Sequence, residues 1–163
     1  MKIVNLNDNQ KTITQNGIIK DLNDDFSTGT TYSETIKEFI NTNSKWNSGN
    51  VNSVQSSLSL KSIEKQTNSY NTIGLLTVGE YVDASVVKNC HLTNNCISYL
   101  STSKNQWLLN NTADNKNWYV DTNNQLLNVV QNSQLFNVYP SIYLKTNVII
   151  SEGTGTEQDP YII

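Results

Sequence analysis

Residues 73–84 read Ile-Gly-Leu-Leu-Thr-Val-Gly-Glu-Tyr-Val-Asp-Ala, and this stretch holds the sharpest structural signals in the chain. Its first four residues form a short apolar run that suits a buried strand. Thr77 and Glu80 are three residues apart, which is the spacing of a capping box, where each side chain accepts a hydrogen bond from the other residue's backbone N–H. Apolar residues then recur at helical spacing. We therefore predict a strand over 73–76 and a helix over 77–87.

A second capping box lies upstream, where Thr31 and Glu34 have the same spacing. It predicts a helix that begins at Thr31 and carries Ile36, Phe39 and Ile40 on one apolar face, which Trp46 can extend. Residues 47–72 are rich in Asn, Ser and Gln, with only scattered Val and Leu. We expect them to form a long, partly ordered excursion.

The first 25 residues are predicted to form a three-stranded antiparallel meander. Residues 2–6 and 11–15 alternate in polarity, and Asn16-Gly17 separates the second run from residues 18–22. Asn-Gly between two such runs is the strongest short hairpin signal.

The second half of the chain is predicted to be mainly short strands, over 107–109, 118–120, 125–130, 138–144 and 148–151. Together with two helices, these strands indicate an α+β fold. The chain has 163 residues and no Pro- or Gly-rich linker, so we expect one domain over residues 1–163.

Composition excludes several classes of protein. Asn, Gln, Ser and Thr account for 69 residues, the net charge is −3, and all eleven cationic side chains are Lys. A chain without Arg and without a net positive charge is poorly suited to bind nucleic acid, so the composition argues against that class. No stretch approaches the roughly 18 apolar residues of a membrane span, so we expect no membrane insertion of this segment. Met1 is not followed by the apolar core of a secretory signal, which leaves a cytoplasmic protein or the loss of a leader or anchor.

The sequence contains few of the residues and motifs that catalytic sites use. His91 is the only imidazole, no Gly-x-Ser-x-Gly motif is present, and adjacent side chains such as Cys90 and His91 usually point apart. We therefore expect no enzyme. Two Cys and one His do not complete a zinc site, so a Cys90–Cys96 disulfide is favoured if the protein is exported, with reduced structural thiols as the alternative.

Calcium is the one metal that the residues leave open, and no other cofactor is expected. Asp21-x-Asn23-x-Asp25 begins like an EF-hand loop, but the required Gly and final Glu are missing. Asp114 and Asp121 lie in a second oxygen-rich region with neighbouring Asn residues and are weak candidates. A solvated loop is the alternative interpretation.

Aromatic and amide side chains supply the candidates for binding. Trp46, Trp107 and Trp118 can stack on sugar rings, although Trp107 and Trp118 sit in apolar strand patterns that favour core packing. The candidate binding residues are Trp118, Tyr119, Asn117 and Asn123, on the strand and turn after the acidic loop.

Three segments resemble a known family. They are residues 26–41, the Ile-Gly-Leu-Leu-Thr core at 73–84, and the ending Tyr139-Pro-Ser-Ile-Tyr-Leu-Lys followed by Gly153-Thr-Gly-Thr and Asp159-Pro-Tyr. The family comprises extracellular proteins of low-GC Gram-positive bacteria, often carried behind a membrane anchor or a pilin-type leader. The resemblance implies a relative of the C-type-lectin and formylglycine-generating-enzyme fold. This chain has Tyr139 where the family usually has Arg.

These observations converge on a functional expectation. We expect a non-enzymatic domain at the extracellular cell surface that serves binding or adhesion, with a glycan or a host or bacterial surface protein as partner. The alternative is the globular α+β head of a pilin-like filament subunit that lacks its N-terminal helix here.

Overall fold

A computed structural model describes residues 2–4, 10–11, 17–28, 34–53, 68–93, 95–98, 100, 103–114, 116–130, 134–154, 159 and 162. Within them the fold is α+β, as predicted, and strands outnumber helices. The helices are α1 (Ile18–Thr28), α2 (Glu34–Phe39), α4 (Val78–Asp83) and the short 3-10 helix η2 (Cys90–Leu92). No helix in these ranges combines the length and apolar character needed to cross a membrane.

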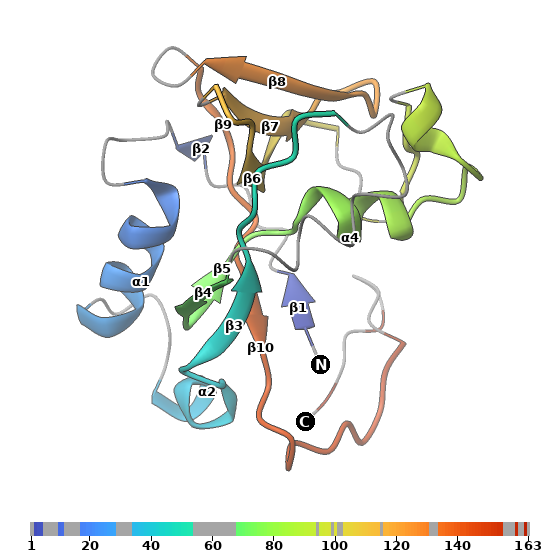
Figure 1. Ribbon diagram of the computed structural model, residues 1–163. Coiled ribbons are helices and arrows are strands. Elements are labelled where there is room, and N and C mark those ends of the chain that lie inside the picture. The colour runs from blue at the N-terminus through green and yellow to red at the C-terminus, as the bar shows by residue number, and fades with distance from the viewer. Residues whose placement is uncertain are drawn as a thin grey trace.

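Among the described residues, the largest sheet has five strands. Its strands, in spatial order, are β2 (Gln10–Lys11), β9 (Phe136–Asn137), β6 (Gln106–Asn111), β7 (Lys116–Val120) and β8 (Leu126–Val130). Between the described strands of this sheet, β6 and β9 pair in parallel and the other pairs are antiparallel. Figure 1 shows α1 and α4 on opposite sides of β6.

Two hydrophobic cores fill the two faces of this sheet. Successive side chains of a strand point to opposite faces. Leu108 and Trp118 therefore pack in one core with α4, while Trp107 and Tyr119 pack in the other with α1. We call these the α4 core and the α1 core. The aromatic rings of Trp107 and Phe136 lie 4.5 Å apart in the α1 core.

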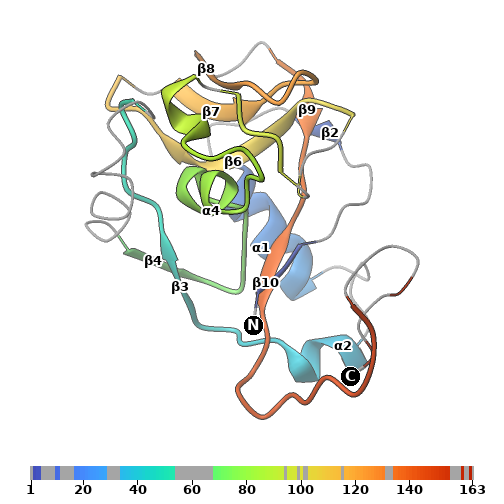
Figure 2. The same cartoon turned by 90° about the vertical axis from the view of Figure 1, so that its right-hand side faces the viewer.

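Two smaller sheets complete the fold. One has the order β1 (Lys2–Val4), β10 (Ser141–Tyr143) and β5 (Ile73–Gly74), and the other pairs β3 (Ser44–Asn47) with β4 (Asn68–Asn71). The end of α2 is tied to the chain around β10, because the Asn41 N–H donates to the Tyr143 carbonyl (2.8 Å). Figure 2 shows β10 running from the five-stranded sheet down to α2.

The predicted N-terminal meander over residues 1–25 is wrong. Residues 18–22 belong to α1, β1 pairs with β10, and β2 pairs with β9. The physical reason lies in Ile18, Leu22 and Phe26, which are all buried and recur every four residues, so a helix places all three in the α1 core. Gly17 has a φ of +78° and directly precedes the helix.

The capping box at Thr77 and Glu80 is confirmed. The Thr77 hydroxyl accepts from the Glu80 N–H (3.1 Å), and Glu80 Oε2 accepts from the Thr77 N–H (2.8 Å). The helix ends at Asp83 rather than at residue 87, because the chain leaves it to pair with the segment after the disulfide. There the Val86 N–H donates to the Ile97 carbonyl (2.8 Å). Thr31, the other predicted cap, lies outside the described residues.

Residues 47–72, predicted to be only partly ordered, contain regular structure that their composition does not indicate. Strand β4 lies within this segment. Trp46 belongs to β3 and therefore does not extend the apolar face of α2. Residues 50–53 lie against the five-stranded sheet, where the Val51 N–H donates to the Asn111 carbonyl (2.7 Å). Residues 54–67 lie outside the described part of the chain.

Most strands of the second half lie where they were predicted. β6, β7 and β8 overlap the predicted runs, and β10 lies within 138–144. The strand predicted at 148–151 is not formed; next to it, Glu152 makes only an isolated bridge with Ile162.

Candidate functional site

A cavity of about 120 Å³ lies between the N-terminal end of α1 and the strands β6 and β7. Its walls come from four separate segments, and they are lined by Gly17, Ile18, Ile19, Leu75, Leu108, Leu109, Asn111 and Asn117. Ile19, Leu109 and Asn111 are only half-buried and keep some accessible surface. We consider this cavity the candidate functional site.

Two amide side chains provide the polar part of the cavity. Asn111 and Asn117 are register partners on β6 and β7, beyond a β-bulge that follows Trp107. The Asn117 Nδ2 group donates to Asn111 Oδ1. Asn117 is only 6% exposed, and its Oδ1 is buried without a hydrogen-bond partner. A buried acceptor without a donor is costly. Because this oxygen has almost no accessible surface, a ligand in the cavity cannot reach it as the side chain stands.

Helix α1 is held at the other wall by the half-buried amide side chain of Asn23. Asn23 Nδ2 donates to the Ile73 carbonyl (2.8 Å), and Asn23 Oδ1 accepts from the N–H groups of Thr72 (2.9 Å) and Ile73 (3.0 Å). These bonds tie the middle of α1 to β5, so the first residues of the helix and Leu75 reach the same cavity.

The electrostatics of the cavity favour neutral groups. The Asp21 N–H donates to the Gly17 carbonyl (3.3 Å), so the backbone N–H groups before Asp21 have no acceptor inside α1 and form the positive end of the helix dipole. None of the residues that line the cavity is ionisable. The helix end disfavours a cation, and no charged side chain lines the cavity to hold an ion of either sign.

The four predicted binding residues do not form one exposed patch. Trp118 is 3% exposed in the α4 core, where its Nε1 donates to the Val51 carbonyl (2.6 Å). Tyr119 is half-buried in the α1 core against Trp107, and burial raises the pKa of its phenol. Asn123 is exposed in the β7–β8 turn, and Asn117 lines the cavity.

The two weak calcium candidates lie at opposite ends of β7. Asp114 is in the β6–β7 turn, where it bonds the Thr112 hydroxyl and lies 2.7 Å from the Lys116 ammonium. Asp121 Oδ1 accepts from the N–H groups of Asn123 and Gln125 (both 2.8 Å). Because a strand separates them, these two carboxylates do not share a metal site, and the described residues contain no metal-binding group of three or more His, Cys, Asp or Glu.

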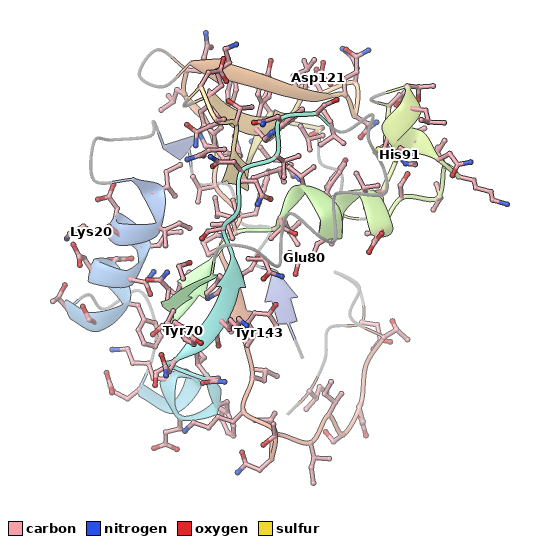
Figure 3. The ribbon with its side chains drawn as sticks, viewed as in Figure 1. Lys20, Tyr70, Glu80, His91, Asp121 and Tyr143 are labelled. Carbon is pink, nitrogen blue, oxygen red and sulfur yellow. A yellow bond between two sulfur atoms is a disulfide. The ribbon has the colours of Figure 1, made fainter. Side chains whose placement is uncertain are left out.

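The Cys90–Cys96 disulfide is confirmed, with a Cα–Cα distance of 4.9 Å. Both cysteines are buried in the α4 core. The disulfide occupies the Cys90 sulfur, so a Cys-His nucleophile is not available in this form. Figure 3 shows His91 on the lobe that follows α4, apart from both Asp121 and Lys20.

Sequence reasoning missed most of the cavity. Ile18 and Ile19 were interpreted as strand residues, and Asn111 and Leu75 were not singled out. The signal that could have located α1 is the recurrence of Ile18, Leu22 and Phe26, which continues past the predicted strand.

Comparisons with known proteins found no match among family models, curated proteins or solved structures. The interpretation of the site therefore depends on its own chemistry.

Proposed function

We propose that this protein is a non-enzymatic extracellular domain of the cell surface that serves binding or adhesion, and that the cavity beside α1 is its binding site. The single observation that carries the proposal is a partly open cavity whose lining residues are aliphatic, amide and glycine. Such a lining can hold a ligand, whereas acid–base catalysis requires titratable groups. The partner would be a glycan or a host or bacterial surface protein.

The extracellular location is supported by the disulfide. Disulfides persist in oxidising compartments and are rare in the cytosol. The composition agrees, because hydroxyl and amide side chains outnumber charged ones in the chain.

A C-type-lectin-like arrangement is the finer fold that we propose. Its support is the order of elements: α2 and α4, then the Trp-bearing strands β6 and β7, and finally β10. An experimental structure compared with lectin domains would test it.

Binding of the oxidised domain to surfaces tests the functional proposal. We expect a fluorescently labelled domain to bind saturably to immobilised glycans, to extracellular matrix proteins or to whole bacterial or host cells. Absence of saturable binding to all of them would contradict the proposal. Concentration-dependent assembly into filaments without such binding would favour the pilin-like head instead.

A further inference from the structure

We infer that β8 pairs edge to edge with the β8 strand of a second copy of this chain, so that the two sheets continue into each other. The inference concerns self-association and does not depend on the ligand that the proposed function leaves open. It starts from the place of β8 at the edge of the largest sheet, where Figure 1 shows it as the outermost strand.

The hydrogen bonds between β7 and β8 determine which backbone groups of β8 face outward. The two strands pair in continuous antiparallel register, and next to the turn the Asp121 N–H donates to the Gln125 carbonyl (3.0 Å). Because hydrogen-bonded pairs alternate along an antiparallel ladder, every second residue after Gln125 also bonds to β7. The N–H and carbonyl groups of Asn128 and Val130 therefore point away from β7.

In the part of the chain that the structure describes, the outer edge of β8 is paired only at its start. There Asn95 forms a bridge with Gln125. The Cys96 N–H also donates to the Asn124 carbonyl (3.0 Å). Upstream of this bridge the chain forms η2, so the pairing does not continue to Asn128. Unpaired backbone groups at the edge of a sheet are a template for another strand.

The sequence of β8 lacks the features that protect edge strands from pairing. Natural edge strands are usually short, or they carry Lys, Pro or a bulge. Residues 125–132 read Gln-Leu-Leu-Asn-Val-Val-Gln-Asn, with no charged residue, Pro or Gly. At the opposite edge of the same sheet, β2 has only two described residues, and one of them is Lys11. The edge formed by β8 is therefore the one open to another strand.

A second copy of β8 is the partner that fits this edge. The strand is uncharged, so two copies meet without like charges opposite each other. In antiparallel pairing about a two-fold axis at Val129, Asn128 of each copy exchanges N–H···O bonds with Val130 of the other. Leu126, which is 1% exposed in the α4 core, holds the strand in place before association. Each copy uses β8 once, so the assembly closes as a dimer.

Sedimentation and amide exchange test the association. Sedimentation velocity of the oxidised protein from about 1 µM to about 1 mM covers weak to moderate affinities. We expect a reversible shift from one chain to two chains per particle, with no larger species. Amide hydrogen exchange, followed by NMR at both ends of this range, locates the contact. The amides of Asn128 and Val130 should gain protection as the dimer forms, whereas those of Leu127 and Val129 should be protected at both concentrations.

Substitutions at Asn128 test the role of the backbone edge. Asn128→Pro removes an outward N–H and no hydrogen bond to β7. We expect it to raise the dissociation constant of the dimer at least about tenfold, because the two-fold axis doubles the loss to two hydrogen bonds. Asn128→Ala keeps the backbone N–H, so this matched control should dimerise as the native protein does. Circular dichroism checks the fold of both variants.

A mixture of labelled and unlabelled native chains provides a second measurement that needs no variant. In the proposed register the Val129 residues of the two copies form a non-hydrogen-bonded pair, whose Cα atoms lie about 4.5 Å apart. We therefore expect an intermolecular NOE between their Hα protons, and its absence from a dimeric sample would overturn the proposed pairing.

Several other outcomes would overturn the inference. They are a protein that stays monomeric over the whole concentration range, and association that a folded Asn128→Pro variant leaves unchanged. Protection of the Asn128 and Val130 amides in the dilute monomer would mean that another segment of the same chain covers the edge. Species that keep growing with concentration would contradict a closed dimer. The surface-binding experiment is independent of these results, so the proposed function can fail or hold separately.

Discussion

Buried Asn side chains hold backbone segments together in this protein. Asn110 is fully buried, and it bonds three backbone groups that belong to two other segments. Asn23, which is half-buried, does the same between α1 and β5. Asn is so abundant in the chain that composition alone does not distinguish these clamps from surface residues. Burial and bonding partners identify them.

Asn110→Ala should lower the free energy of unfolding by about 3 kcal/mol, because it orphans the Val78 N–H and the carbonyls of Asn47 and Gly49. Urea denaturation followed by Trp fluorescence measures the change. Asn123→Ala, at an exposed position, is the control and should stay within about 0.5 kcal/mol. Equal effects at the two sites would contradict the clamp.

Replacement by alanine should destabilise the fold more at Gly74 than at Gly17. A Cβ at Gly74 would lie 2.5 Å from a ring carbon of Trp46, which is itself 1% exposed, so Gly74→Ala should destabilise the fold by about 2 kcal/mol or more through overpacking. Gly17 has open space around it but a φ of +78°, so Gly17→Ala should cost only about 1 kcal/mol. Denaturant midpoints rank the two variants, and the reverse order would refute this account.

Helix α4 is the element whose local sequence and structure agree best. Both hydrogen bonds of its capping box are made, and Thr77 is buried at the start of the α4 core. Thr77→Ala should lower the free energy of unfolding by about 1 kcal/mol, because the Glu80 N–H loses its acceptor. Thr77→Ser keeps the hydroxyl and should retain most of that stability. Thermal unfolding followed by circular dichroism compares the two, and a larger loss with Ser than with Ala would count against the cap.

The β6–β7 turn carries a perturbed carboxylate. Hydrogen bonds from Lys116 and Thr112 hold the pKa of Asp114 below its ordinary value of 3.8. The stability from this ionised group is therefore present above pH 3.8 and is lost as the pH falls through the lower folded-state pKa. An NMR titration should show the lowered pKa in the native protein and a rise toward the ordinary value in Lys116→Met. An unchanged pKa in that variant would exclude the ion pair as the main cause.

At the scale of the whole molecule, one sheet separates two cores that draw on distant parts of the chain. The α1 core combines residues from α1, β5, β6 and β9, and the α4 core combines α4, the disulfide and the strands β6 to β8. β10 connects further distant parts of the chain, because it pairs with both β1 and β5. The candidate cavity lies where α1 meets β6 and β7, so its shape depends on the correct docking of that helix.

The disulfide should matter for the stability of the whole fold. Closing so short a loop removes chain entropy worth about 2 kcal/mol from the unfolded state. Replacing both Cys90 and Cys96 by Ala should lower the free energy of unfolding by at least that amount, because both side chains also pack in the α4 core. Urea unfolding with and without reductant measures the effect. A variant as stable as the oxidised protein would contradict it.

Local patterns in the sequence were sufficient for a large part of the fold. The α4 capping box, the buried run at 73–76, the strands β6 to β8 and the pairing of Cys90 with Cys96 all depend on residues close together in the chain. The direction of successive side chains along a strand or helix is set by the local backbone, so the matching apolar pattern can be recognised in the sequence without knowledge of the fold.

Only the tertiary structure decided the conformation of residues 18–22, the role of Trp118 and the position of the cavity. Residues 18–22 match both a strand and a helix, and the helix prevails because it buries Ile18, Leu22 and Phe26 together against the five-stranded sheet. Trp118 is a plausible sugar platform in the sequence and a core residue in the fold. The cavity brings together residues 17–19, 75, 108, 109, 111 and 117. No local pattern predicts this arrangement, because it arises from burial between segments distant in sequence.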